Sequence, residues 1–83
     1  MRLVISDRAK KDLVSMDPKN RRRVQEAIDR MMLDLRAADV KKIRVQKDRW
    51  RLRVGDWRVI FKYDEQAKII EVIYVRHRRE AYK

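Results

Sequence analysis

Residues 49–61 read RWRLRVGDWRVIF, and this stretch decides the fold of the chain. Apolar and basic side chains alternate along most of it, on both sides of Gly55-Asp56, and a period of two is typical of β-strands. A glycine in a two-residue loop supplies the positive φ that a type II′ turn requires. The stretch is therefore predicted to form a β-hairpin that turns at Gly55-Asp56.

Counting outward from the turn gives the register of this hairpin. The predicted pairs are Val54 with Trp57, Arg53 with Arg58, Leu52 with Val59, Arg51 with Ile60, Trp50 with Phe61 and Arg49 with Lys62. Side chains alternate across a strand, so the aromatic residues share one face and the basic residues share the other. We call the basic side the cationic face, and it consists of Arg49, Arg51, Arg53, Arg58 and Lys62.

The cationic face has two interpretations. Like charges that are paired across strands destabilise a sheet, so a sheet shaped by stability alone would mix acidic or neutral residues into this face. We interpret it as a surface that binds an anion. The alternative is the solvated face of a very basic protein. The aromatic side chains Trp50, Trp57 and Phe61 are interpreted as core rather than as platforms for stacking bases.

The composition of the whole chain limits its function. The chain has 83 residues and a formal net charge of +11, and residues 1–83 are predicted to form one domain. Such a charge favours nucleic acid, an anionic membrane surface or an acidic protein as partner. There is no cysteine and only one histidine, so a metal site built from these residues is not expected. No signal peptide or membrane span is recognised, and a cytoplasmic location is predicted.

The N-terminal segment is predicted to form a strand and a helix. Residues 2–5, RLVI, are typical of a short strand. Ser6 is placed to cap a helix that turns Ala9 and Leu13 inward and stops near Met16.

A second helix is predicted to start at Asp17-Pro18, where an N-cap is followed by proline at the first helical position. Apolar residues then recur at helical spacing, and the helix is predicted to run to about Ala37. The apolar residues are Val24, Ile28, Met31 and Leu35. The outer face of the helix is basic and carries Arg21, Arg22, Arg23 and Arg30.

After Asp39 the pattern changes to strands. The predicted segments are VKKIRVQ (40–46), RWRLRV (49–54), WRVIFKY (57–63) and KIIEVIYVR (68–76). The fold class is therefore α+β: a short N-terminal strand, a two-helix hairpin, then an antiparallel strand run forming one twisted sheet, with a short C-terminal tail or helix. The helices are expected to cover one face of the sheet, and the last long strand is expected to lie centrally.

The C-terminal segment carries a second motif. Residues 75–83 read VRHRREAYK, a basic segment with Tyr82 near its end. WRLRVGDWRVIF followed by VRHRREAY closely resembles the RelE/ParE superfamily of bacterial and archaeal toxin-antitoxin toxins, on the RelE side. The motifs cover about residues 40–82, and the strand-helix-helix start agrees with that fold. The resemblance implies an endoribonuclease that enters the ribosomal A site and cuts mRNA there.

The resemblance also implies a set of site residues. The catalytic positions that match by motif are Arg49, Arg51, Arg58, Arg78 and Tyr82, and the candidates for binding RNA or phosphate are Arg53, Lys62 and His77. Arginine binds phosphate through two N–H groups but does not give up a proton at ordinary pH, so these arginines would stabilise charge. Tyr82, whose phenolate nearby arginines would favour, is the candidate base, with Arg78 or His77 beside the leaving group.

The partners that the resemblance implies are an acidic antitoxin protein, the ribosome and mRNA. No membrane partner and no cofactor are expected, and a toxin-antitoxin heterotetramer is the expected assembly. The implied cut is attack of the ribose 2′-OH on the adjacent phosphate. Two alternatives stay open: a ParE-like inhibitor of DNA gyrase, which needs no nuclease chemistry, and a non-catalytic RNA-binding module.

Overall fold

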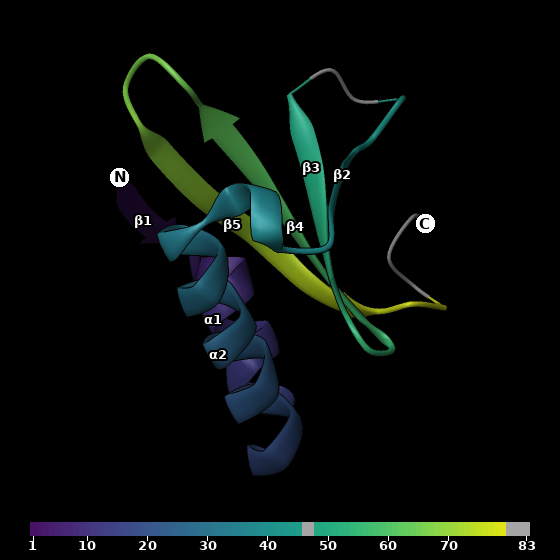
Figure 1. Ribbon diagram of the computed structural model, residues 1–83. Coiled ribbons are helices and arrows are strands. Elements are labelled where there is room, and N and C mark those ends of the chain that lie inside the picture. Colours follow the sequence, from purple (N-terminus) through teal and green to yellow (C-terminus); the bar gives the residue numbers. More distant parts are fainter. Residues whose placement is uncertain (46–47, 80–83) are drawn as a thin grey trace.

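The computed structural model describes residues 1–45 and 48–79. The elements are β1 (Arg2–Ile5), α1 (Asp7–Ser15), α2 (Pro18–Leu33), the 3₁₀ turn η1 (Leu35–Ala37), β2 (Val40–Lys42), β3 (Arg49–Val54), β4 (Trp57–Asp64) and β5 (Ile69–His77) (Figure 1). This order confirms the predicted α+β fold of a strand, two helices and a run of strands. The predicted C-terminal tail or helix lies outside the described residues from position 80 onward.

Both helices begin at the predicted caps. Oγ of Ser6 accepts the N–H of Ala9 at 3.1 Å, and Oδ2 of Asp17 accepts the N–H of Asn20 at 3.2 Å. Pro18 is the first residue of α2, where its missing N–H leaves no hydrogen bond unmade. In the part of the chain that the structure describes, neither helix has the length and apolar character needed to cross a bilayer.

The second helix ends earlier than predicted. The apolar residue Leu35 continues the helical periodicity, which suggested a helix to Ala37, but α2 ends at Leu33. Asp34 leaves the helical conformation with a φ of −152°, and its carboxylate accepts the N–H of Arg36 at 3.0 Å. A capping side chain therefore stops α2 and starts a separate 3₁₀ turn.

The first strand after the helices is also shorter than predicted. Residues 40–46 were expected to be extended, but β2 covers only Val40–Lys42. The N–H of Ile43 still donates to the carbonyl of Arg49 at 3.0 Å, and residues 44 and 45 already belong to the turn toward β3.

The described strands form one sheet in the order β1-β5-β4-β3-β2. β1 runs parallel to β5, and the other neighbouring strands are antiparallel. β5 lies inside the sheet, with β4 in the middle. The register of β3 and β4 is the predicted one at every pair, from Val54 with Trp57 to Arg49 with Lys62. Gly55 has a φ of +58°, as the predicted turn requires.

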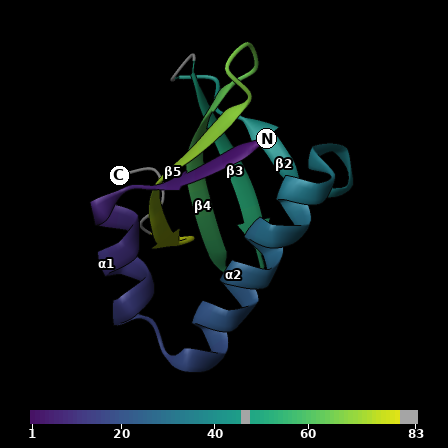
Figure 2. The same cartoon turned by 90° about the vertical axis from the view of Figure 1, so that its left-hand side faces the viewer.

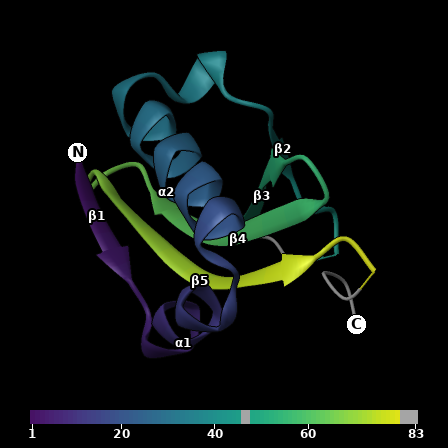
Figure 3. The ribbon, with the colours of Figure 1, turned by 90° about the horizontal axis from the view of Figure 1, so that it is seen from below.

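The core lies between the sheet and the helices. Figures 2 and 3 show α2 crossing one face of the sheet and α1 lying beside β5, beyond the end of β1. The buried cluster comprises Ala9, Leu13, Met16, Val24, Ala27, Ile28, Met31, Leu52, Val59, Phe61, Ile70, Val72 and Val75. None of the described helices covers the opposite face, which is the cationic face.

A β-bulge interrupts β5. Phe61 of β4 pairs with Val72, but the next residue, Ile60, pairs with Tyr74. Ile73 is therefore an extra residue in β5.

The bulge reverses the alternation of side chains in the second half of β5. Val75 joins the core and is only 2% exposed, whereas Tyr74 and Arg76 lie on the cationic face. Strict alternation from Val72 would have placed these residues on the opposite sides.

Candidate functional site

Three rows of register partners cross the cationic face. They are Arg53-Arg58-Arg76 nearest the hairpin turn, Arg51-Ile60-Tyr74 in the middle, and Arg49-Lys62-Glu71 beyond. Six of these nine positions are cationic and one is acidic. The five residues predicted for the cationic face therefore lie together, across β3 and β4, on the side of the sheet opposite α2.

Ile60 occupies the middle of the cationic face and is 0% exposed. It lies outside the core cluster, because its side chain is on the other side of the sheet. Its register partners Arg51 and Tyr74 are both half-buried. Arginine and tyrosine can cover an apolar neighbour with their carbon atoms while their polar ends reach water. The cationic groups are therefore arranged around an apolar centre.

Arg49 and Arg51 are the two basic residues of β3 that lie farthest from the hairpin turn, and both are half-buried. Nη1 of Arg49 is buried and has no hydrogen-bond partner in the part of the chain described. A buried donor without a partner is unfavourable by about 1–3 kcal/mol, and an anion bound beside it would remove that penalty. Lys62 faces Arg49 and forms an exposed ion pair with Asp48 at 3.7 Å, which contributes little stability.

Arg58 is held against the hairpin turn. Its Nη1 donates to the carbonyl of Gly55 at 2.8 Å and to the carbonyl of Trp57 at 2.9 Å. Arg23 of α2 reaches the same turn from the helix side: its Nη2 lies 3.0 Å from the position that a Cβ on Gly55 would take. Two arginines therefore meet at this turn, and one of them belongs to the cationic face.

Arg78 follows β5 and lies at the same end of the sheet. Its N–H donates to the carbonyl of Asp56 at 2.6 Å, and its Nε lies 3.8 Å from Oδ1 of Asp56. The Arg78 side chain is 58% exposed. The structure thus brings Arg78 of the C-terminal motif to the turn that holds Arg58.

His77 does not join the cationic face. It pairs with Trp57 of β4, whose side chain packs against the core. The two rings meet edge-on, with centroids 5.5 Å apart and planes at 85°. Tyr82, the candidate base, lies outside the described residues.

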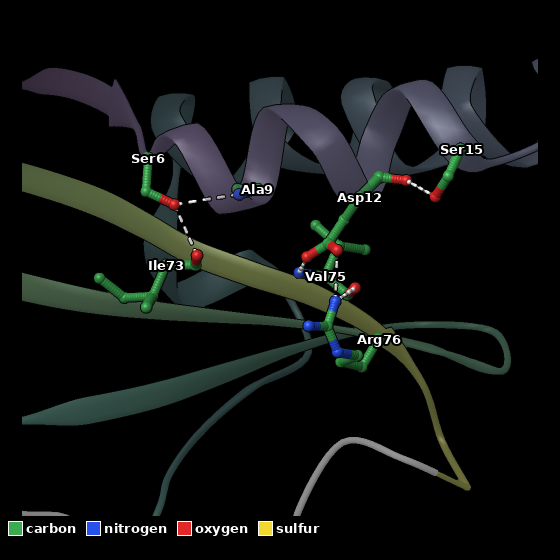
Figure 4. Close-up of polar contacts among 7 residues, drawn as sticks. All are labelled: Ser6, Ala9, Asp12, Ser15, Ile73, Val75 and Arg76. Atoms are coloured by element: carbon green, nitrogen blue, oxygen red, sulfur yellow. Dashed lines mark hydrogen bonds and ion pairs between the residues drawn. The ribbon is translucent and has the colours of Figure 1, made fainter.

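Beyond the end of β1, the N-cap and the first helix take the place of a neighbouring strand and bind the backbone of β5 (Figure 4). The N–H of Ser6 donates to the carbonyl of Val72 at 2.9 Å, and its hydroxyl donates to the carbonyl of Ile73 at 2.5 Å. Further along, a carboxylate oxygen of Asp12 accepts the N–H of Val75 at 2.9 Å. Ser6, the N-cap of α1, and Asp12 within α1 therefore satisfy the backbone groups of β5 that a neighbouring strand would otherwise bind.

The same carboxylate forms an ion pair with Arg76. Oδ1 of Asp12 contacts Nη1 of Arg76, and the two side chains are 16% and 23% exposed. The Arg76 guanidinium lies over the ring of Tyr74, 5.4 Å from its centroid, and Arg8 of α1 lies over the same ring at 4.7 Å. Sequence patterns gave no signal for this cluster, because its members are far apart in the chain and the bulge changes the face on which two of them lie.

Comparison with known proteins shows the family. A model of the family described as the ParE toxin of type II toxin-antitoxin system, parDE, matches residues 3–82. The chain therefore belongs to this family of toxins, within the RelE/ParE superfamily that the sequence motifs indicated. Comparison with curated proteins finds no match.

Several solved structures are similar to this chain. A chain of the archaeal RelE-RelB complex from Pyrococcus horikoshii OT3 is 28% identical, with a TM-score of 0.76 over 96% of this chain and 97% of that one. The isolated E. coli RelE toxin is 16% identical, with a TM-score of 0.77 over 98% and 87% of the two chains. The YoeB/ParE toxin from Agrobacterium tumefaciens is 17% identical, with a TM-score of 0.76 over 93% and 98%. The last two likenesses show the fold alone.

Proposed function

We propose that this toxin is a ribosome-dependent endoribonuclease that cleaves mRNA in the A site. The observation that carries the proposal is the cationic face, where five predicted basic residues lie together around Ile60 on the side of the sheet without a helix. An extended surface of guanidinium groups matches the phosphates of a single RNA strand in charge and in hydrogen-bond geometry.

In the proposed reaction the ribose 2′-oxygen bonds to the adjacent phosphorus and the bond from phosphorus to the 5′-oxygen breaks. The products are a 2′,3′-cyclic phosphate and a 5′-OH. Arg49, Arg51 and Arg58 stabilise the charge that develops on the phosphorane oxygens. Tyr82 as phenolate takes the 2′-OH proton, and the leaving oxygen takes a proton from water.

Between the two candidates for the leaving-group side, the geometry favours Arg78. Arg78 is exposed beside the turn that holds Arg58, whereas His77 packs edge-on against Trp57 on the core side. Arg78 would stabilise the negative charge on the leaving oxygen without donating its own proton.

A cytoplasmic acidic antitoxin is the proposed protein partner. The support is the net charge of +11 and the solved structures of related chains as RelE-RelB complexes. An acidic segment on the cationic face would block RNA directly. A toxin-antitoxin heterotetramer is the proposed assembly.

A second candidate is inhibition of DNA gyrase. It is favoured by one observation, the match to a family model named for ParE. That activity needs a binding surface only, and the cationic face would then contact a protein or DNA rather than a scissile phosphate.

Primer extension on a translated mRNA tests the proposal. Discrete cuts at A-site codons that require ribosomes, and that disappear in the Arg58→Ala and Tyr82→Phe variants, are the expected result. A gyrase inhibitor would leave the mRNA intact and stop DNA supercoiling in a purified gyrase assay. A non-catalytic RNA-binding module would retain RNA without either effect.

A further inference from the structure

Arg76 extends the cationic face beyond the residues that the family motifs indicate. It pairs with Arg58, which in turn pairs with Arg53, so one row of arginines crosses β5, β4 and β3. Neighbouring strands lie about 4.8 Å apart, so guanidinium groups in such a row stand within reach of consecutive phosphates of one nucleic-acid strand. The position of Arg76 in this row is a consequence of the bulge at Ile73.

Contacts on three sides hold the Arg76 guanidinium. Its Nη1 contacts Oδ1 of Asp12 and donates to the carbonyl of Val75 at 3.1 Å, and its plane lies over the Tyr74 ring. The other oxygen of Asp12 accepts the N–H of Val75. The carboxylate is therefore fixed by the sheet edge and fixes the arginine in turn, as Figure 4 shows.

Part of the Arg76 guanidinium stays available for hydrogen bonds to a ligand. Within residues 1–45 and 48–79, the hydrogen bonds of the Arg76 side chain run through Nη1, which leaves Nε and Nη2 without such a bond. Arginine presents its donors in a rigid planar fork, so an arginine that is fixed through one nitrogen can offer the others to phosphate without losing further side-chain freedom.

We propose that Arg76 is a further phosphate-binding residue of the cationic face and that Asp12 is its positioning residue. This inference rests on the proposed function, since it adds a contact to the same RNA site. The competing interpretation is that the Asp12-Arg76 pair only fastens α1 to β5. A purely structural pair would affect stability and leave RNA binding unchanged.

The test uses the full-length protein and a fluorescein-labelled, single-stranded oligoribonucleotide of about 12 nucleotides, whose affinity is measured by anisotropy over a range of salt concentrations. Arg76→Gln should reduce the slope of log affinity against log salt by about 0.7, and weaken binding about fivefold at 0.1 M salt, as expected for one lost phosphate contact. The matched control is Arg22→Gln, which removes the same charge from the exposed side of α2. It should leave the slope nearly unchanged.

Asp12 is tested by a double-mutant cycle. Asp12→Asn keeps an oxygen that can accept the Val75 N–H but removes the charge that holds Arg76. It should weaken RNA binding about threefold when Arg76 is present, because a loosened side chain must be ordered on binding, and should have no effect in the Arg76→Gln background. Asp12→Glu serves as the second variant, and thermal melts restrict the comparison to folded proteins.

The outcomes separate this inference from the proposed function. An unchanged salt slope in Arg76→Gln, while the wild type cleaves mRNA, overturns the inference and leaves the function standing. A reduced slope without cleavage by the wild type supports the phosphate contact and rejects the nuclease. An equal effect of Asp12→Asn in both backgrounds, or tighter binding, rejects the positioning role.

Discussion

Arg53 of β3 and Arg58 of β4 are register partners, one pair away from the hairpin turn. Arg58 faces a further arginine, Arg76, on its other side. Two like-charge pairs in one row are unfavourable for the sheet by themselves, so the row indicates selection for binding rather than for stability. Arg58 stands between the other two and is held by the carbonyls of Gly55 and Trp57.

Replacing Arg58 with alanine should slow mRNA cleavage by about two to three orders of magnitude, the scale expected when one preorganised stabilising group is deleted. Stability should hardly change, because the side chain is on the cationic face and its removal relieves repulsion from Arg53. Ribosome-dependent cleavage rates measured beside thermal melts check both parts. A variant that unfolds, or one that cleaves at the wild-type rate, would show that this role is wrong.

Trp57→Ala should have the opposite profile. Trp57 is one residue away but lies on the helix side, where it packs against the core cluster and meets the His77 ring. Because it is only partly buried, we expect a loss of about 3 kcal/mol, at the lower end for removal of a large aromatic side chain. Urea unfolding measures this loss, with His77→Ala as a milder control. If Trp57→Ala stays as stable as the wild type and only cuts more slowly, the assignment of the two faces fails.

The hairpin and both helix starts could be predicted because their determinants are local. Gly55 sets the turn, and from the turn the register follows by counting. Ser6 and Asp17 cap their helices within three residues. The end of α2 could not be read from periodicity, because the side chain of Asp34 overrides the apolar spacing that Leu35 continues.

The contacts between α1 and β5 could not be predicted, because they join residues near the two ends of the chain. The bulge at Ile73 adds one residue without any break in the apolar pattern of β5, so strict alternation assigns Tyr74 and Arg76 to the wrong face. The contact of Asp12 with Arg76 depends on this reversed alternation. The one trace of the reversed alternation in the sequence is that the core residues Val72 and Val75 are three residues apart instead of two or four. This spacing can be recognised only when it is known that both residues are buried.

Gly55→Ala should destabilise the fold by about 1–2 kcal/mol. The φ of Gly55 is +58°, a conformation in which a Cβ is strained, and the added carbon would lie 3.0 Å from Nη2 of Arg23. The Arg23 guanidinium is the end of a flexible side chain and can move, so the backbone strain should dominate. Chemical unfolding of Gly55→Ala with and without Arg23→Ala separates the two causes. Full recovery in the double variant would assign the loss to the close contact instead.

The N-cap of α2 should make stability depend on pH in the acid range. The pKa of Asp17 lies below its ordinary value of 3.8, chiefly because its carboxylate accepts the backbone N–H of Asn20, a bond that the unfolded chain lacks. The unfolded state therefore takes up this proton at higher pH than the folded state, so the cap stabilises the fold above the ordinary pKa and loses its contribution as the pH falls through the lowered pKa of Asp17.

Asparagine caps helices about as well and does not titrate, so Asp17→Asn should match the wild type near pH 7 and gain on it in melting temperature below about pH 4. Asp17→Ala should be less stable near pH 7, with a gap that closes in acid. If the melting temperatures of the three proteins change in parallel between neutral and acid pH, the Asp17 carboxylate contributes nothing to the cap.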